Sequence, residues 1–181
     1  MKLKQLVHKA ITDKPPQLDT YGDYYAPYYN LMYILASQIN NGLLVELGVN
    51  KGRGLISLAA ANKSNKVIGL DSHVWTGLHE SLIDYPNAWF LNMPSMPVPI
   101  VISEHRRKIR LLHIDTEHSY SMAKAEFEAY KPYLAKGAYV LFDDLHAMDD
   151  DVMRFFNELD YEKVQDDRLH PSCGYGVLIY A

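Results

Sequence analysis

Short apolar runs alternate along the chain with longer segments of helical period, beginning at about residue 43. Four of these runs are nearly all apolar and have a carboxylate at or next to their ends: 43–47, 67–70, 110–114 and 138–142. Such runs are typical of strands buried on both faces, and residues 88–91 predict a weaker strand. Because strands that alternate with helices form parallel sheets, the pattern predicts an α/β fold.

The segments between and after these runs predict helices and a closing hairpin. Helical compositions occupy residues 54–61, 119–133 and 148–159, and Lys136-Gly137 provides a helix stop and a turn. The last part of the chain predicts an antiparallel β-hairpin, with strands at 161–164 and 176–180 joined through His170-Pro171-Ser172. Three prolines within six positions make 92–105 a loop.

The N-terminal segment is less regular than the rest of the chain. Residues 1–20 have no clear period and are expected to form an arm, and 24–38 predict a helix interrupted near Pro27. We therefore divide a single domain into an arm and helix packed on the core at 1–40 and a ligand-binding part at 41–181. A length of 181 residues suits one sizeable core and is short for two domains.

Composition narrows the partner to a small molecule. An apolar share of 48% and a charged share of 22% are those of a globular protein, and no segment approaches the roughly 18 apolar residues that span a bilayer. The net charge of −4 argues against a nucleic-acid partner. Cys173 is the single cysteine, which excludes an internal disulfide. The first residues lack a signal-peptide pattern, so a cytoplasmic location is expected.

A glycine-containing turn follows the first apolar run and predicts a cofactor loop. Glu46 lies at the end of the run, and Gly48 and Gly52 allow a tight turn whose backbone N–H groups face a ligand. A dinucleotide site would need a glycine where Asn50 stands, so a ligand without phosphates fits better. Asp71 directly follows the next run, where a carboxylate can accept hydrogen bonds from both hydroxyls of a ribose. Ser72, which follows it, is a second candidate for cofactor binding.

A second cluster of carboxylates follows the later runs. Asp115 ends one run and Asp143-Asp144 the other, so adjacent strands would bring three carboxylates together. An oxygen-only set suits a divalent cation such as Mg²⁺. In the alternative, Asp144 caps the next helix and only Asp143 faces the cleft. The same residues also allow a different function, a metal-dependent hydrolase. Its mixed histidine and carboxylate ligands would be His113, Asp115, His118, Asp143 and His146.

Histidines and aromatic residues supply the remaining candidates. His118 and His146 follow the carboxylates, and either could remove a proton from an acceptor hydroxyl. Six tyrosines recur at near-helical spacing, and with Trp75 and Trp89 they predict either an aromatic lid or ordinary packing and an oligomer contact. These tyrosines are Tyr21, Tyr24, Tyr25, Tyr28, Tyr29 and Tyr33.

Four stretches carry a resemblance to a known family: VELGVNKGRG, VIGLDSHVWTG, LLHIDTEHSYSMAKAEFEAYKPYLAKGAYVLFDDLH and GYGVLIY. They resemble the class I S-adenosylmethionine-dependent methyltransferases, in the branch of metal-assisted O-methyltransferases of macrolide sugars and cephalosporin-hydroxylase-like proteins. The resemblance covers most of 43–181 and is most specific over 111–146.

The resemblance implies a Rossmann-like fold, with a seven-stranded sheet and S-adenosylmethionine over Gly48. It places Glu46, Asn50, Gly52, Asp71, Ser72 and Asp115 at the cofactor, and a metal near Asp115, Asp143 and Asp144 that holds the hydroxyl of a small-molecule or glycan acceptor. His118 or His146 would take the proton. The chain departs from the family in two places. Its middle segment is short and proline-rich, which leaves only Asn92 and Ser95 as candidate adenine contacts. The family often has a glycine two residues before the active-site histidine, where this chain has Thr116-Glu117 and so an added charge near the metal. A catalytically altered cofactor-binding module is therefore a further hypothesis.

Overall fold

The computed structural model describes residues 1–13, 26–106 and 108–181, which fold around one seven-stranded sheet of order β3-β2-β1-β4-β5-β7-β6. The first five strands of this order are parallel, and β7 runs antiparallel to both of its neighbours. This sheet confirms the predicted fold class, antiparallel C-terminal hairpin included. Its strands are β1 (Leu43–Leu47), β2 (Lys66–Asp71), β3 (Ala88–Asn92), β4 (Ile109–Ile114), β5 (Leu134–Phe142), β6 (Glu162–Gln165) and β7 (Gly176–Ile179).

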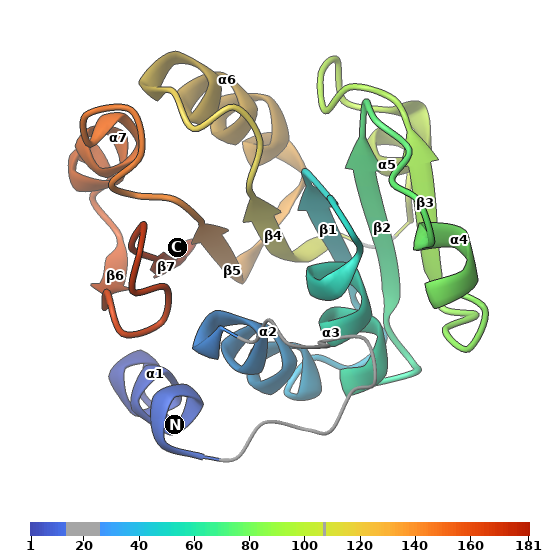
Figure 1. Ribbon diagram of the computed structural model, residues 1–181, viewed down its shortest axis with the longest axis horizontal. Coiled ribbons are helices and arrows are strands. Elements are labelled where there is room, and N and C mark those ends of the chain that lie inside the picture. The colour runs from blue at the N-terminus through green and yellow to red at the C-terminus, as the bar shows by residue number, and fades with distance from the viewer. Residues whose placement is uncertain (14–25, 107) are drawn as a thin grey trace.

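Helices cover both faces of the sheet and give the three layers (Figure 1). One face carries α1 (Leu3–Thr12), α2 (Pro27–Ser37) and α3 (Arg53–Ala61). The other carries α5 (Ile100–Ser103), α6 (Tyr120–Tyr130) and α7 (Asp151–Glu158). The short α4 (Leu78–Ser81) lies near the β3 edge, and a 3-10 turn, η2 (Lys131–Tyr133), leads into β5. Over the described part of the chain, none of the helices has the length and apolar character needed to cross a membrane.

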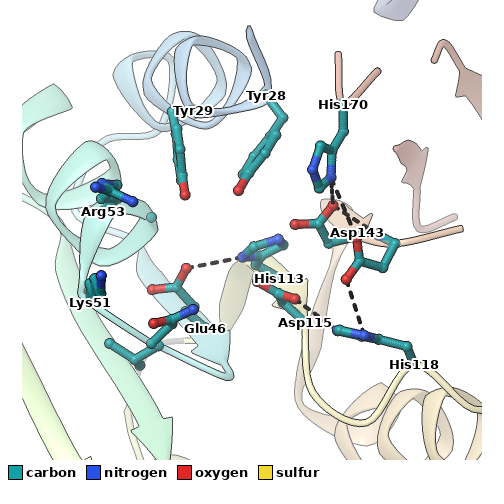
Figure 2. Close-up of a pocket in the computed structure, with 14 residues that line it drawn as sticks. Tyr28, Tyr29, Glu46, Lys51, Arg53, His113, Asp115, His118, Asp143 and His170 are labelled. Carbon is teal, nitrogen blue, oxygen red and sulfur yellow. Dashed lines mark hydrogen bonds and ion pairs between the residues drawn. The ribbon is translucent and has the colours of Figure 1, made fainter. Parts of the chain in front are cut away.

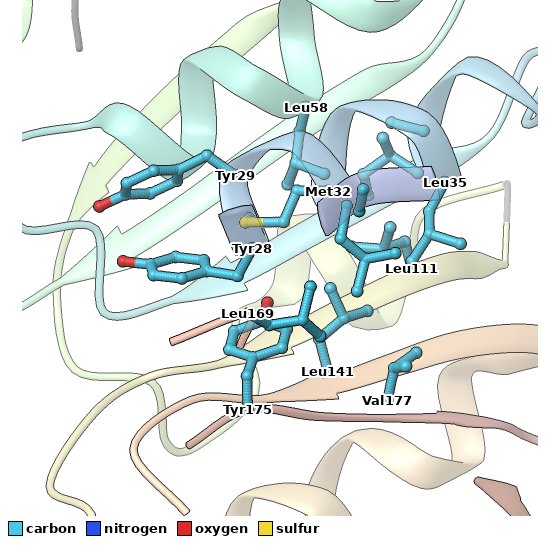
Figure 3. Close-up of a cluster of buried hydrophobic side chains, with 14 of the residues drawn as sticks. Tyr28, Tyr29, Met32, Leu35, Leu58, Leu111, Leu141, Leu169, Tyr175 and Val177 are labelled. Carbon is cyan, nitrogen blue, oxygen red and sulfur yellow. The ribbon is translucent and has the colours of Figure 1, made fainter. Parts of the chain in front are cut away.

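Two apolar clusters, one on each face, follow from the alternation of side chains along the strands. Leu111 and Leu141 face α2, where they join Met32 and the stacked rings of Tyr28 and Tyr175 (Figure 3). The next residues along these two strands, Leu112 and Phe142, face α6 and α7. The central strands are thus buried on both faces, as expected of parallel strands beneath helices.

The N-terminal arm is the main local difference from the sequence-based expectation. Residues 3–12 form a helix whose leucines and alanine enter the same apolar cluster as α2. The side-chain amide of Asn30 on α2 donates to the carbonyl oxygen of Ala10 at 3.0 Å and ties the two helices together. Pro27 does not interrupt α2 but begins it, because proline fits the first helical turn, where no N–H is needed.

Three other boundaries differ from the expected ones. The residues expected to begin the last long helix, 148–150, have positive φ and precede α7. The strand expected from 138 begins at Leu134, and the predicted turn at Lys136-Gly137 lies inside β5. The loop expected over 92–105 contains the one-turn helix α5. The arm positions 14–20 lie outside the described residues.

Candidate active site

The loop that follows β1 lies where the sheet reverses its strand order. The chain leaves β1 toward β2 on one side, while β4 lies on the other. Ligands of open parallel sheets bind at the carboxyl ends of the strands beside such a reversal. Gly48 adopts a φ of +83°, and a Cβ there would overlap the backbone carbonyl oxygen of Asp115. Gly48 is therefore required for the close approach of the loop to the end of β4.

Asp71 at the end of β2 holds this loop in place. Its Oδ2 accepts hydrogen bonds from the backbone N–H groups of Val49 at 3.0 Å and Asn50 at 2.9 Å. Its Oδ1 accepts from the N–H of His73 at 2.8 Å. Asn50 has a φ of +49°, which asparagine tolerates better than most residues. The consecutive N–H groups of the loop are thus used by a carboxylate of the protein itself.

Two cavities open on either side of this loop and share the residues Asn50, Asp115 and His118. The larger, of about 430 Å³, extends past Asp71 to Trp75, Ser95 and Met122. The smaller, of about 340 Å³, lies beneath the first turn of α2. Tyr28 and Tyr29 point their hydroxyls into it from α2, opposite Glu46 and His113 (Figure 2). These volumes are those of small-molecule sites.

Glu46 and His113 form a buried pair at the floor of the smaller cavity. Oε1 of Glu46 lies 3.1 Å from Nδ1 of His113, and both side chains are at most 3% exposed. Burial raises the pKa of Glu46 to about 7, although His113 opposes the shift. Burial alone would lower the pKa of His113, but the hydrogen bond to Glu46 and the charges of Glu46, Asp115 and Asp143 together raise it. The pair therefore holds a proton near neutral pH.

One oxygen of Glu46 and one nitrogen of His113 remain available to a ligand. Oε2 of Glu46 and Nε2 of His113 are buried and lack a hydrogen-bond partner among the described residues. Gly54 on α3 admits the Glu46 carboxylate, since a Cβ there would overlap Oε1. Buried polar atoms of this kind carry a desolvation cost that a bound polar group would relieve.

A histidine lies between two of the predicted metal ligands. His118 Nε2 lies 3.2 Å from Asp115 Oδ1, and its Nδ1 lies 3.0 Å from Asp144 Oδ2. The hydrogen bond to Asp115 and the charge of Asp144 raise the pKa of His118. His118 and Asp144 both have positive φ, at 61° and 50°, a conformation that costs energy in residues other than glycine and is concentrated at functional sites.

A second histidine, His170, contacts the remaining carboxylate. Its Nδ1 lies 2.7 Å from Oδ1 of Asp143, a side chain that is only 3% exposed. Burial and the nearby charge of Asp115 raise the pKa of Asp143 to about 6, and His170 opposes this shift. Each carboxylate of the cluster is thus accompanied by an imidazole (Figure 2).

The structure brings most of the predicted site residues to the two cavities. Those that line them are Glu46, Gly48, Asn50, Asp71, Ser72, Asp115, His118, Asp143 and Asp144. Gly52 instead precedes α3 as its N-cap residue, with a φ of +84°. His146 lies outside both cavities, with its side chain 37% exposed and its ring 2.6 Å from Asp150. Ser95, one of the two expected adenine contacts, lines the larger cavity, whereas Asn92 donates to the carbonyl oxygen of Asp71.

Of the aromatic residues predicted to form a lid, some line the two cavities and others do not. Tyr28 and Tyr29 line the smaller cavity and Trp75 the larger, whereas Trp89 lies on the edge strand β3 and is 42% exposed. Tyr33 lies at a separate surface hollow between α1 and α2. Tyr21, Tyr24 and Tyr25 fall outside the described residues.

Sequence reasoning missed His170, Arg53 and Lys51, which also line the smaller cavity. Lys51 lies within the glycine turn and Arg53 follows it as the first residue of α3, so their closeness to the cofactor loop was available as a signal. From the sequence alone, His170 is only part of the turn that joins the last two strands. Its place follows from the antiparallel pairing of β5 and β7, in which Phe142 lies opposite Gly176.

Residues 45–145 match the model of a protein family described as a methyltransferase domain. This stretch includes the loop, Asp71 and all three carboxylates of the cluster. The chain belongs to this family. A search of curated proteins finds no significant match for the methyltransferase.

Solved structures show the same fold at low sequence identity. A TDP-rhamnose 3′-O-methyltransferase of calicheamicin biosynthesis is 20% identical, with a TM-score of 0.66 over 98% of this chain and 92% of that one. An O-methyltransferase from Bacillus cereus, in complex with S-adenosylhomocysteine, is 13% identical, with a TM-score of 0.69 over 99% and 90%. TomG from Streptomyces achromogenes, an O-methyltransferase in complex with S-adenosylmethionine, is 15% identical, with a TM-score of 0.64 over 99% and 92%. At these identities the methyltransferase shares the fold with all three.

Proposed function

We propose that this methyltransferase uses S-adenosylmethionine to methylate a hydroxyl group of a small-molecule or glycan acceptor, with a divalent cation assisting. The observation that carries the proposal is the pair of cavities that meet at Asn50, Asp115 and His118. One cavity suits a nucleoside and the other is lined by acid–imidazole pairs. A methyl donor in the first would therefore place its reacting end beside groups that can hold an acceptor and a proton.

The larger cavity fits the adenosine part of the cofactor. Asp71 would hold the ribose through Oδ1, which accepts one hydrogen bond, from the N–H of His73, and keeps a lone pair for a hydroxyl, whereas Oδ2 already accepts from Val49, Asn50 and the indole N–H of Trp75. Trp75 and Met122 offer apolar surface for the adenine, and Ser95 offers a polar edge. The positive charges of Lys51 and Arg53 and the carboxylate of Glu46 lie on the side where the amino-acid end would enter. S-adenosylmethionine supplies a methyl group that its sulfonium makes electrophilic.

The carboxylate cluster fits a divalent cation. Asp115 offers a ligand atom within 4.8 Å of those of His113 and Asp143, and likewise of those of His118 and Asp144. The sets combine oxygen and imidazole donors, which suit Mn²⁺ or Fe²⁺ as well as Mg²⁺. Such a cation would position the acceptor hydroxyl and lower its pKa.

His118 is the group we assign to proton removal. It lines both cavities, and its two ring nitrogens lie beside Asp115 and Asp144. A cation bound to these carboxylates would engage them in place of the imidazole and leave a ring nitrogen of His118 to accept the proton. Tyr28 faces the same space, and burial together with the charge of Asp143 raises the pKa of its hydroxyl well above the usual range. Tyr28 therefore stays protonated and can donate a hydrogen bond to the acceptor. His146, the other base considered, lies outside the cavities.

The other hypotheses are less well supported. The metallohydrolase is disfavoured by the match to a methyltransferase domain, and His146 does not line the cavity that holds His113 and Asp115. A catalytically altered module that only binds the cofactor differs from an active methyltransferase in one measurable respect, the absence of methyl transfer. The cytoplasmic location, the homo-oligomer and the division at residue 40 stay predictions.

The test is formation of S-adenosylhomocysteine in the presence of hydroxyl acceptors. We would incubate the protein with S-adenosylmethionine and a nucleotide sugar, a catechol or a phenol, with Mg²⁺ or with EDTA, and identify products by mass spectrometry. We expect an acceptor that gains one methyl group, and a rate that falls about 10²-fold or more in His118→Asn. The matched control His146→Asn should keep the wild-type rate. Cofactor binding without turnover over the whole panel would instead support the altered module.

A further inference from the structure

A buried acid on α6 takes no part in the proposed reaction. Glu126 lies within this helix, and its side chain is fully buried. Met122 and Tyr130 lie about one turn before and after it, on the same face of the helix. Met122 lines the larger cavity, and Tyr130 is fully buried. This face of α6 therefore borders the cavity to which we assign the adenosine.

Glu126 contacts two segments that are distant in sequence and that both line this cavity. Its Oε2 accepts a hydrogen bond from the hydroxyl of Thr116, in the loop after β4, at 2.8 Å. Its Oε1 is buried and has no partner among the described residues other than the side chain of Ser95, in the proline-rich segment after β3. The hydroxyl of Tyr130 donates to the backbone carbonyl oxygen of Ser95 at 2.7 Å. One helix thus holds both walls of the cavity.

These hydrogen bonds fix the direction in which the two hydroxyls point their protons. A carboxylate can only accept, so Ser95 and Thr116 each donate to Glu126. Burial raises the pKa of Glu126, and the two hydrogen bonds oppose this shift because they stabilise the charged form. A hydroxyl has a single proton, so any hydrogen bond that Ser95 or Thr116 makes with a ligand in the cavity must be one that it accepts.

We propose that Glu126 is a positioning residue that makes the site selective for an amino group at position 6 of the purine, by orienting the hydroxyls of Ser95 and Thr116. The inference rests on the proposed function, in which the larger cavity binds the adenosine part of the cofactor. Adenine carries an amino group at this position and can donate to a hydroxyl oxygen, whereas hypoxanthine carries a carbonyl oxygen that would face another acceptor. Such a mismatch is costly because it leaves buried polar groups unpaired.

The test compares S-adenosylhomocysteine with S-inosylhomocysteine, which differ in the group at position 6 of the purine, by calorimetric titration of the full chain. We expect the wild-type chain to bind the adenosine compound at least about tenfold more tightly. Glu126→Gln should bring the two affinities to within about threefold of each other, because the glutamine amide donates to one hydroxyl and frees that hydroxyl to donate to the ligand. A merely structural role would lower both affinities together and leave their ratio unchanged.

Glu128→Gln is the matched control and should keep the wild-type ratio, because Glu128 lies on the same helix with its side chain 52% exposed beside Lys131. If circular dichroism shows that Glu126→Gln does not fold, Thr116→Val and Ser95→Ala remove the oriented hydroxyls singly, and at least one of them should lower the ratio to within about threefold.

The proposal would be overturned by equal wild-type affinities for the two compounds. It would equally be overturned by a ratio that a folded Glu126→Gln, or both hydroxyl variants, leave unchanged while S-adenosylhomocysteine still binds. A wild-type chain that binds neither compound would contradict the proposed function itself, and the inference with it.

Discussion

Replacing Asp71 by asparagine perturbs the contact between β2 and the cofactor loop without changing the size of the side chain. The carboxylate accepts three backbone hydrogen bonds, from Val49, Asn50 and His73. The asparagine oxygen can still accept the first two, but its amino group then faces the N–H of His73, so that two donors oppose one another. Hydrogen bonds to a charged group contribute about 1.5–3 kcal/mol each.

We therefore expect Asp71→Asn to lower the free energy of unfolding by about 2 kcal/mol, which in a chain of this size lowers Tm by roughly 4–8 °C. Urea unfolding measures this loss directly. Asp84→Asn, which removes the same charge from an exposed position, is the matched control and should change stability by less than about 0.5 kcal/mol. The reasoning about the loop is refuted if the two variants are equally stable. Affinity for S-adenosylhomocysteine should also fall about tenfold or more, since the ribose would lose a charged partner.

Three further predictions concern the loop, the last helix and the buried acid. Gly48→Ala should cost about 2–4 kcal/mol in urea unfolding, whereas Gly77→Ala, at the same φ of +83° but with open space around its Cβ, should cost only about 1 kcal/mol; equal costs would contradict the predicted overlap. Lys163 donates to three carbonyl oxygens at the end of α7, at 2.6–3.0 Å, so Lys163→Met should cost about 1–3 kcal/mol, and an unchanged Tm would exclude this capping role. Because the pKa of Glu46 is raised from 4.5 to about 7, the native state binds more protons than the unfolded chain in that range, so stability should fall as pH rises from about 4.5 to 7. Glu46→Gln should flatten this dependence, and an identical pH profile would count against the buried pair.

The central strands could be predicted from the sequence because their side chains are buried on both faces. The run 43–47 coincides with β1, and the carboxylates that close the other runs lie at the expected edge of the sheet. The positions of Glu46, Asp71 and Asp115 at the site follow from strand ends alone. This part of the site could be predicted from the apolar runs and from the rule that ligands bind at the carboxyl ends of parallel strands.

The remaining features depend on contacts between distant segments. Leu6 of α1 is buried in a cluster that residues of α2 and of the sheet also form, and a ten-residue helix has little stability of its own. His170 reaches Asp143 through the pairing of β5 with β7, which no local pattern contains. His146 follows Asp143 by three residues, as His118 follows Asp115, yet of the two histidines only His118 lines the cavities. Spacing alone could not distinguish the two histidines.

Calorimetric titration of the chain with S-adenosylhomocysteine tests the central claim most directly, because it requires neither the acceptor nor turnover. The account predicts binding of one molecule per chain, weakened in Asp71→Asn and unchanged in Asp84→Asn. The absence of heat and of any thermal stabilisation at millimolar ligand, with or without Mg²⁺, would contradict it.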